Sequence, residues 1–272
     1  MKLGLQMWSI NDVCLQQGMR RAMEQIAPMG YQGFEFALGR YPTLWEMTRE
    51  RPADVAQAMK DNGVEPIGIH IGLNHILERT AEVIDEMHAL GVPYAGIAPA
   101  FYGDREPHPR QKALYADVVR AAKLLKAEDI QMQVHCAVFG YLLDYKERPT
   151  SLGMIEEAGI DLLQPEFDTA WVICSGLDPA ELLRMYKGHT DVLHFKDYHP
   201  CFTPSPYILV DHNTIGDYGY GCAVGDNGVQ DVKTIVDAAR EAEVKWVVTE
   251  LWNEENALEN AAISAKNILA CM

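Results

Sequence analysis

A regular alternation of short apolar runs and amphipathic stretches extends along the whole chain, and it constrains the fold more than any other feature. Eight runs have the length and the β-branched or aromatic content of buried strands. They cover residues 3–8, 33–37, 65–71, 94–98, 131–137, 162–168, 192–197 and 246–251. Helical patterns fill the intervals, at residues 16–29, 53–62, 76–90, 110–127, 151–158, 179–187, 229–243 and 256–269. The sequence therefore predicts strands and helices in alternation.

The spacing of these units predicts a closed barrel. Eight strand–helix units in 272 residues give about 34 residues per unit, which matches the size of a (β/α)8 barrel. The rival fold, an open doubly wound sheet, carries a glycine fingerprint after its first strand, and none follows here. We expect an α/β protein with a single (β/α)8 TIM barrel that forms one domain over residues 1–272.

The composition narrows the range of partners. The chain has a formal net charge of -16 and no run rich in Lys or Arg, so its surface repels phosphate backbones and anionic lipids. Its six cysteines are scattered without a CxxC pair. The apolar N-terminal run is broken at Asn11 and Asp12, too early for a signal peptide or a membrane span. We expect a cytoplasmic protein with free thiols and with no nucleic-acid or membrane partner.

Polar side chains gather where the predicted strands end. In a (β/α)8 barrel the carboxyl ends of the strands form the mouth where functional residues lie. Each of these polar residues closes an apolar run, which solubility alone does not explain. They are, in chain order, Glu35, His70, His135, Asp168, His194 and Glu250.

Four of them predict a metal site. His135, Asp168, His194 and Glu250 follow four consecutive strands, so they share one arc of the barrel rim. Two imidazoles and two carboxylates suit transition metals better than Ca²⁺ or Mg²⁺, which prefer oxygen ligands. Four protein ligands leave an open position only on a five- or six-coordinate ion, which favours Mn²⁺, with Zn²⁺, Co²⁺, Fe²⁺ and Mg²⁺ as alternatives. Such an ion can polarise a carbonyl and acidify the neighbouring C–H.

Strand periodicity adds candidates around this site. Residues two apart share a face of a strand, so Lys196 points the same way as His194 and could stabilise a developing oxyanion. Asp197 faces outward and is expected to brace a neighbouring helix or loop. Glu166 shares the face of Asp168 and is expected one layer below the rim.

Other residues allow two interpretations. Glu35 and His70 are candidates for substrate binding, although a lone histidine or carboxylate at a strand end is more often structural, as expected for His75 and His199. Three tryptophans would be core packing by default and would become sugar-stacking platforms only if they line the mouth. They are Trp8, Trp171 and Trp252.

A long segment follows the seventh strand, at about residues 200–228. It is rich in Gly, Tyr and Pro, and we expect a loop that folds over the mouth and excludes water from the reaction. A surface insertion, or a subunit contact in a homo-oligomer, is an alternative of equal weight.

Several motifs resemble a known family. "HFKD" in the seventh strand, "FDTAWVICSGLDP" in the sixth, and "AVGDNGVQDVKTIVDAAREAEVKWVVTELW" through the eighth resemble the sugar phosphate isomerase/epimerase family with its xylose-isomerase-like barrel. "LGLQMWSI" and "GYQGFEF" are similar to its first two strands. The resemblance implies a barrel that acts in carbohydrate metabolism and holds one divalent ion, often Mn²⁺, through residues that match His135, Asp168, His194 and Glu250.

One position departs from the family's epimerases. Their fifth-strand ligand is commonly a glutamate that exchanges protons together with the eighth-strand glutamate, whereas this chain has His135, as inosose-dehydratase-like relatives do. This departure opens a one-base mechanism as the alternative to two carboxylates, with Glu250 or His135 as the base and Lys196 assisting.

The expected function is a metal-dependent isomerase or epimerase of a sugar, sugar phosphate or cyclitol. One alternative is a lyase or dehydratase that performs β-elimination on a keto-sugar, a keto-glycoside or an inosose. Another is a non-catalytic sugar-binding or assembly subunit. The endonuclease IV branch of this barrel needs three zinc ions and a basic face, which the charge of -16 opposes. Few Lys or Arg residues are expected at the rim, which weakens the case for a phosphorylated substrate.

Overall fold

Eight parallel strands close into a barrel in the computed structural model, which describes residues 1–98, 109–136, 150–200, 219–251 and 256–272. The strands lie around the barrel in the order β1-β10-β7-β6-β5-β4-β3-β2. Their bounds are Lys2–Gln6 (β1), Gly33–Ala37 (β2), Glu65–His70 (β3), Tyr94–Ile97 (β4), Gln131–Cys136 (β5), Leu163–Asp168 (β6), Val192–Phe195 (β7) and Trp246–Thr249 (β10). The predicted fold class is confirmed.

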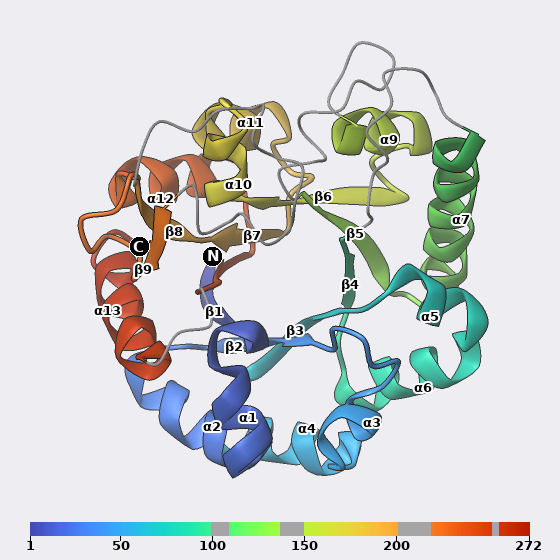
Figure 1. The fold of residues 1–272 in the computed structure, drawn as a ribbon, viewed down its shortest axis with the longest axis horizontal. Coiled ribbons are helices and arrows are strands. Elements are labelled where there is room, and N and C mark those ends of the chain that lie inside the picture. Colours follow the sequence, from blue (N-terminus) through green and yellow to red (C-terminus); the bar gives the residue numbers. More distant parts are fainter. Residues whose placement is uncertain (99–108, 137–149, 201–218, 252–255) are drawn as a thin grey trace.

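Helices surround this barrel on all sides (Figure 1). The described α-helices are Asn11–Gln17 (α1), Met19–Ile26 (α2), Leu44–Thr48 (α3), Pro52–Asp61 (α4), Leu73–Glu78 (α5), Thr80–Leu90 (α6), Pro109–Lys126 (α7), Thr150–Ala158 (α9), Thr169–Cys174 (α10), Pro179–Met185 (α11), Val232–Glu241 (α12) and Ala257–Leu269 (α13). Short 3-10 helices cover Met7–Ile10 (η1) and Ala27–Met29 (η2). Within the described ranges, no helix is both long and apolar enough to cross a membrane.

Two predicted helices are divided in the structure. The helix expected at residues 16–29 breaks at Gly18, because the Gly18 φ of 87° lies outside the helical region. The helix expected at residues 76–90 breaks at Arg79, where φ is -129°. Apolar residues continue at helical spacing on both sides of each break, so the spacing of apolar residues alone does not reveal the breaks.

Three predicted strands each end two residues earlier than expected. The strand expected at residues 3–8 ends at Gln6, whose side chain accepts a hydrogen bond from the Trp8 N–H and starts η1. The strands expected at residues 192–197 and 246–251 end at Phe195 and Thr249. At the mouth the chain leaves the barrel in each case, into η1 after β1 and toward a hairpin after β7.

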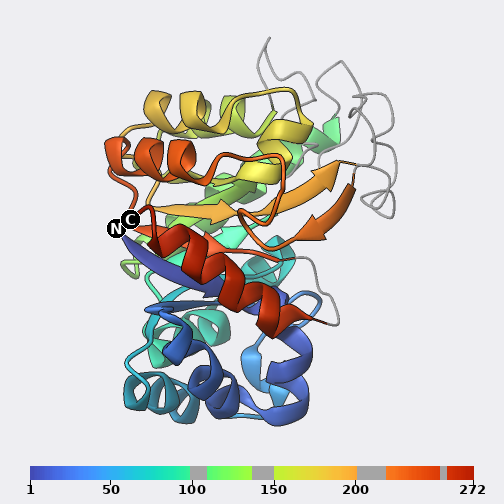
Figure 2. The same ribbon diagram turned by 90° about the vertical axis from the view of Figure 1, so that its left-hand side faces the viewer.

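The end of β7 leads into a hairpin. Strand β8 (Asp197–Pro200) pairs antiparallel with β9 (Gly219–Cys222). Figure 2 shows this hairpin at the end of the barrel opposite to the two chain termini. The long loop expected at residues 200–228 is thus framed by a hairpin. Its residues 201–218 lie outside the described ranges, so its expected closure over the mouth stays a prediction.

The barrel interior is packed differently from the layer between strands and helices. Most buried apolar side chains form one large core, among them Leu3, Phe34 and Phe36. A separate small cluster joins side chains from β3, β4, β7 and β10, and therefore lies inside the barrel: Ile67, Tyr94, Val192, Trp246 and Val248. Glycines of β1 and β2 make room for it, since a Cβ on Gly4 would lie 2.3 Å from Ile67 Cδ1. Above this cluster the interior becomes polar.

The barrel closes through its first and last strands. Strand β1 pairs with β10 in a parallel register that sets Lys2 beside Trp246 and Leu5 beside Thr249. On its other edge β10 pairs with β7, with Thr249 beside Phe195. Glu250, directly after β10, therefore lies at the mouth next to the end of β7.

Candidate functional site

The four predicted metal ligands converge at the mouth of the barrel. His135 lies in β5, Asp168 ends β6, His194 lies in β7 and Glu250 follows β10. Each offers one ligand atom, and these atoms all lie within 4.8 Å of one another. All four side chains are buried. Strand register produces this convergence directly, because Asp168 pairs with His194 and His194 pairs with Val248.

Two of these ligand atoms lack a hydrogen bond. His135 Nε2 lies 3.7 Å from Asp168 Oδ2 and 3.6 Å from Glu250 Oε2, too far for hydrogen bonds. Both His135 Nε2 and Asp168 Oδ2 are buried without a hydrogen-bond partner in the described part of the chain. Atoms that share one Zn²⁺-like ion at about 2.1 Å each can lie up to about 4.2 Å apart. The separations of 3.6 Å and 3.7 Å and the donor set therefore fit a divalent ion.

Lys196 completes this group from the same face as His194, as predicted. Its Nζ donates to Glu250 Oε1 at 2.6 Å and lies 3.9 Å from Asp168 Oδ2. The Lys196 backbone is held by the Thr169 hydroxyl, which accepts from the Lys196 N–H and donates to its carbonyl. Gln230 Nε2 also donates to that carbonyl. The ammonium group is therefore fixed at the site.

The charges in the site perturb one another strongly. Burial by itself would lower the pKa of His135, but the carboxylates of Asp168 and Glu250 raise it to about 9. Burial by itself would raise the pKa of Glu250, but Lys196 and the two histidines lower it well below its usual range. Burial likewise opposes protonation of Lys196, and the same carboxylates raise its pKa. The ionised carboxylates create a negative potential that favours a cation.

A second polar layer lies directly below. His70 Nε2 lies 2.7 Å from Glu166 Oε2, and His194 Nε2 lies 2.6 Å from Glu35 Oε2. Together with His194, these three residues form a second group that could hold a metal ion. The Glu166 carboxyl has a pKa of about 2, because the nearby histidines outweigh the effect of burial. Burial and the Glu166 charge raise the pKa of Glu35.

Glu166 is a member of the site that the sequence analysis gave no role. It was expected one layer below the rim, and it is there, fully buried. The period of two that links it to Asp168 is the signal that could have identified it. Its partner His70 lies 96 residues earlier in the chain, and the spacing of residues in the sequence does not reveal this contact.

The remaining predicted site residues lie in different surroundings. Trp171 is buried in α10, with Lys196 Nζ 5.6 Å from its ring centroid. Trp8 follows β1 and is 46% exposed, so its default assignment to the core is wrong. Trp252 lies outside the described residues. Glu35 is only 1% exposed and contacts His194, and substrate binding by Glu35 or His70 stays a prediction.

Asp197 has the bracing role that was expected. Its carboxylate accepts hydrogen bonds from the backbone N–H groups of Tyr198, Gly225 and Val229. His199 Nδ1 lies 3.0 Å from the carbonyl oxygen of Asn227 in the same segment. Both residues therefore hold the segment after β9 against the start of β8.

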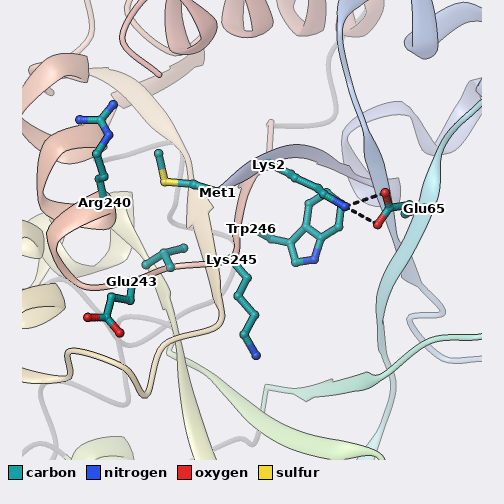
Figure 3. A pocket seen from close by; sticks show the side chains of 8 residues that line it. Met1, Lys2, Glu65, Arg240, Glu243, Lys245 and Trp246 are labelled. Atoms are coloured by element: carbon teal, nitrogen blue, oxygen red, sulfur yellow. Dashed lines mark hydrogen bonds and ion pairs between the residues drawn. The ribbon is translucent and has the colours of Figure 1, made fainter.

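A cavity of about 480 Å³ lies at the other end of the barrel, among the amino ends of β1 and β10. Figure 3 shows Lys2 bonded to both oxygens of Glu65 beside the Trp246 ring. The ammonium group of Lys2 is 5.2 Å from that ring's centroid. In (β/α)8 barrels this face serves stability, whereas catalysis uses the opposite face. We therefore assign no function to this cavity.

The chain is similar to known proteins in sequence and in fold. Residues 23–270 match the family model described as the xylose isomerase-like TIM barrel. A sugar phosphate isomerase/epimerase from Parabacteroides distasonis ATCC 8503 has a similar structure, with 18% identity, 97% of this chain and 92% of that chain covered, and a TM-score of 0.75. No curated protein sequence matches the chain.

Two further solved structures share the fold. The IOLI protein, solved with a binding zinc atom, is 14% identical over 100% of this chain and 98% of that chain, with a TM-score of 0.73. The probable 3-DHS dehydratase AsbF of Bacillus anthracis, involved in petrobactin synthesis, is 15% identical over 99% of both chains, with a TM-score of 0.74. At these identities the likeness establishes the fold.

Proposed function

Because the chain belongs to the xylose isomerase-like TIM barrel family, we propose that it is a divalent-metal-dependent isomerase or epimerase of a small sugar or cyclitol. The observation that carries this proposal is the buried convergence of His135, Asp168, His194 and Glu250, with two ligand atoms lacking hydrogen bonds. An isomerase/epimerase and a zinc-containing protein among the structural relatives support it.

The four converging residues would hold the ion, with Mn²⁺ favoured and Zn²⁺, Co²⁺, Fe²⁺ or Mg²⁺ as alternatives. When bound, the ion supplies a Lewis acid that acidifies the C–H beside a substrate carbonyl. The proton would pass to the carboxylate of Glu250, which Lys196 keeps ionised, or to His135. The Lys196 ammonium group would stabilise negative charge on a substrate oxygen. The buried position of these groups strengthens each of these interactions.

A second candidate is a lyase that eliminates a group β to the carbonyl. His135 favours this lyase. The epimerases that the chain resembles use two glutamate bases, one from the fifth strand and one from the eighth. Here His135 replaces the first of them, and Glu250 is left as the one carboxylate base. The probable 3-DHS dehydratase among the structural relatives supports the lyase. The substrates would be a keto-sugar, a keto-glycoside or an inosose.

Two measurements test the proposal. Metal analysis of the purified protein is expected to find one divalent ion per chain, and a folded protein that binds none would refute it. Incubation of candidate sugars in D₂O then separates the reactions. Isomerisation or epimerisation leaves the substrate mass unchanged apart from incorporated deuterium, whereas elimination releases water or an aglycone.

Glu250→Gln tests the base. We expect the turnover rate to fall by about 10²–10⁴-fold, the range for loss of a general base, and more if metal binding is also lost. Glu259→Gln, which changes an exposed glutamate of α13, is the matched control. If the protein binds sugar but shows no turnover, and Glu250→Gln leaves that binding intact, the chain is a non-catalytic sugar-binding subunit instead.

A further inference from the structure

The imidazole of His194 has a carboxylate at each ring nitrogen. Nδ1 lies 2.6 Å from Glu250 Oε2 at the proposed metal site, and Nε2 lies 2.6 Å from Glu35 Oε2 in the layer below. His194 and Glu35 are both at most 1% exposed, so water does not compete for these contacts. His194 therefore connects the two polar layers through its two nitrogens.

We propose that Glu35 is a positioning residue that holds a proton on His194 Nε2 and so directs the Nδ1 lone pair to the metal. A neutral imidazole carries one N–H, and the hydrogen bond made by one nitrogen decides which nitrogen can bind a metal. With Nε2–H donating to Glu35, the lone pair of the ring lies on Nδ1, which faces Glu250 and can bind an ion together with His135, Asp168 and Glu250. This inference rests on the metal site of the proposed function.

The surroundings leave Glu35 as the acceptor for Nε2. Glu166 Oε1 is 3.5 Å from His194 Nε2 and makes no hydrogen bond to the described residues, so it is too far to replace Glu35. Glu166 is instead bonded to His70 through its other oxygen, at 2.7 Å. Gly96 makes that pair fit, since a Cβ there would lie 2.5 Å from His70 Cδ2. The pair holds Glu166 where it makes no hydrogen bond to His194.

The lower group could instead hold a second ion, and the single lone pair of a neutral His194 argues against this. Both of its histidines lie in short contacts with carboxylates, of 2.6 Å and 2.7 Å. A neutral His194 has a single lone pair on its ring nitrogens and so cannot bind two ions at once. One ion per chain is therefore expected, with Glu35 outside its coordination shell.

Glu35→Gln tests the proposal through Zn²⁺ affinity and the protons of His194. We expect the affinity, measured by competition with a chromophoric chelator, to fall by about 10–100-fold, the usual effect of losing such a partner. In ¹⁵N-histidine NMR spectra of the Zn²⁺-loaded wild type, His194 should be protonated at Nε2 and metal-bound at Nδ1. In metal-free protein, the Nε2 proton should lose its low-field shift in Glu35→Gln.

A matched substitution serves as the control. Glu86→Gln alters a buried carboxylate of α6 that accepts a hydrogen bond from the Leu44 N–H, outside both polar layers. It should change the Zn²⁺ affinity by less than about threefold, well below the effect expected of Glu35→Gln.

Three outcomes would overturn the proposal. An unchanged affinity and His194 spectrum in Glu35→Gln would remove the positioning role while the metal site stands. Two Zn²⁺ ions per chain, falling to one in Glu35→Gln, would make the lower layer an ion site. A folded wild type that binds neither Zn²⁺ nor any of the other divalent ions would refute the proposed function, and the orientation of His194 toward a metal with it.

Discussion

At the scale of single residues, the site depends on a missing side chain. Gly96 of β4 faces the pair formed by His70 and Glu166. A Cβ at this position would lie 2.5 Å from His70 Cδ2, 2.6 Å from His70 Nε2 and 2.9 Å from Glu166 Oε2. Real Cβ atoms do not approach so closely, and the ring and the carboxylate are both held by neighbours. The glycine is thus a requirement of the lower polar layer.

Gly96→Ala is therefore expected to destabilise the protein. The added methyl group must displace a buried histidine–carboxylate pair, and overpacking of this kind costs about 1–3 kcal/mol. Urea unfolding of the metal-free protein measures the loss. Gly68→Ala is the control, since its nearest neighbour is a backbone oxygen at 3.2 Å, and its loss should be smaller. Equal losses in the two variants would contradict the steric explanation.

The sequence predicted which four residues converge at the mouth but not the contacts below them. The convergence of His135, Asp168, His194 and Glu250 could be predicted because each closes an apolar run and parallel strands end at the same face. The contact between Glu35 and His194 joins residues far apart in the chain across the barrel interior. This contact depends on the length of the two side chains and on the space that glycines leave inside the barrel. The period of two in the strands predicts neither.

At the scale of elements, the junction between β7 and β8 organises one side of the mouth. The parallel strand ends at Phe195, Lys196 turns into the site, and Asp197 begins the hairpin. The Asp197 carboxylate accepts N–H groups from the segment after β9. Gly228 allows this contact, because a Cβ there would lie 2.2 Å from Asp197 Cγ.

Asp197→Ala should loosen that segment. Removing the carboxylate leaves the Gly225 N–H without its acceptor and the Val229 N–H with only the Tyr198 carbonyl, at a net cost of about 0.5–1.5 kcal/mol per hydrogen bond lost. We expect faster hydrogen exchange at these two amides, measured by NMR, and little change in β1. Asp226→Ala, an exposed acid of the same turn, is the control. Unchanged exchange in Asp197→Ala would show that the carboxylate does not hold the segment.

Sequence patterns located the elements better than their ends. The eight strands lie where the apolar runs predicted them, because a buried parallel strand needs a continuous apolar stretch. The helix expected to begin at residue 229 begins at Val232 instead, since the Asp231 side chain accepts a hydrogen bond from the Thr234 N–H and caps it. The short helix α10 was not predicted, because six residues are too few for a helical period.

At the scale of the whole molecule, an ion at the proposed site would link four strands. Its ligands come from β5, β6, β7 and the end of β10, which are neighbours around half of the barrel. A ligand that binds only the folded state stabilises it according to its concentration relative to Kd. The metal site should therefore control global stability as well as activity.

Removal of the metal is expected to lower the melting temperature. An ion present at 100 times its Kd adds about 2.7 kcal/mol to the free energy of unfolding. For a protein of this size this corresponds to a decrease of several degrees after treatment with EDTA, which differential scanning calorimetry can measure. Glu250→Gln should show a smaller difference between its EDTA-treated and metal-loaded forms. An EDTA-insensitive wild type would contradict a structural contribution from the ion.

The pairing of β1 with β10 has a consequence for synthesis in the cell. The barrel closes only when the last strand reaches the first, and Glu250 follows that last strand directly. A chain still attached to the ribosome can present His135, Asp168 and His194 before Glu250 has emerged. The complete set of four residues therefore forms only after Glu250 has emerged, so an ion at the proposed site would be bound after the last strand of the barrel has been made.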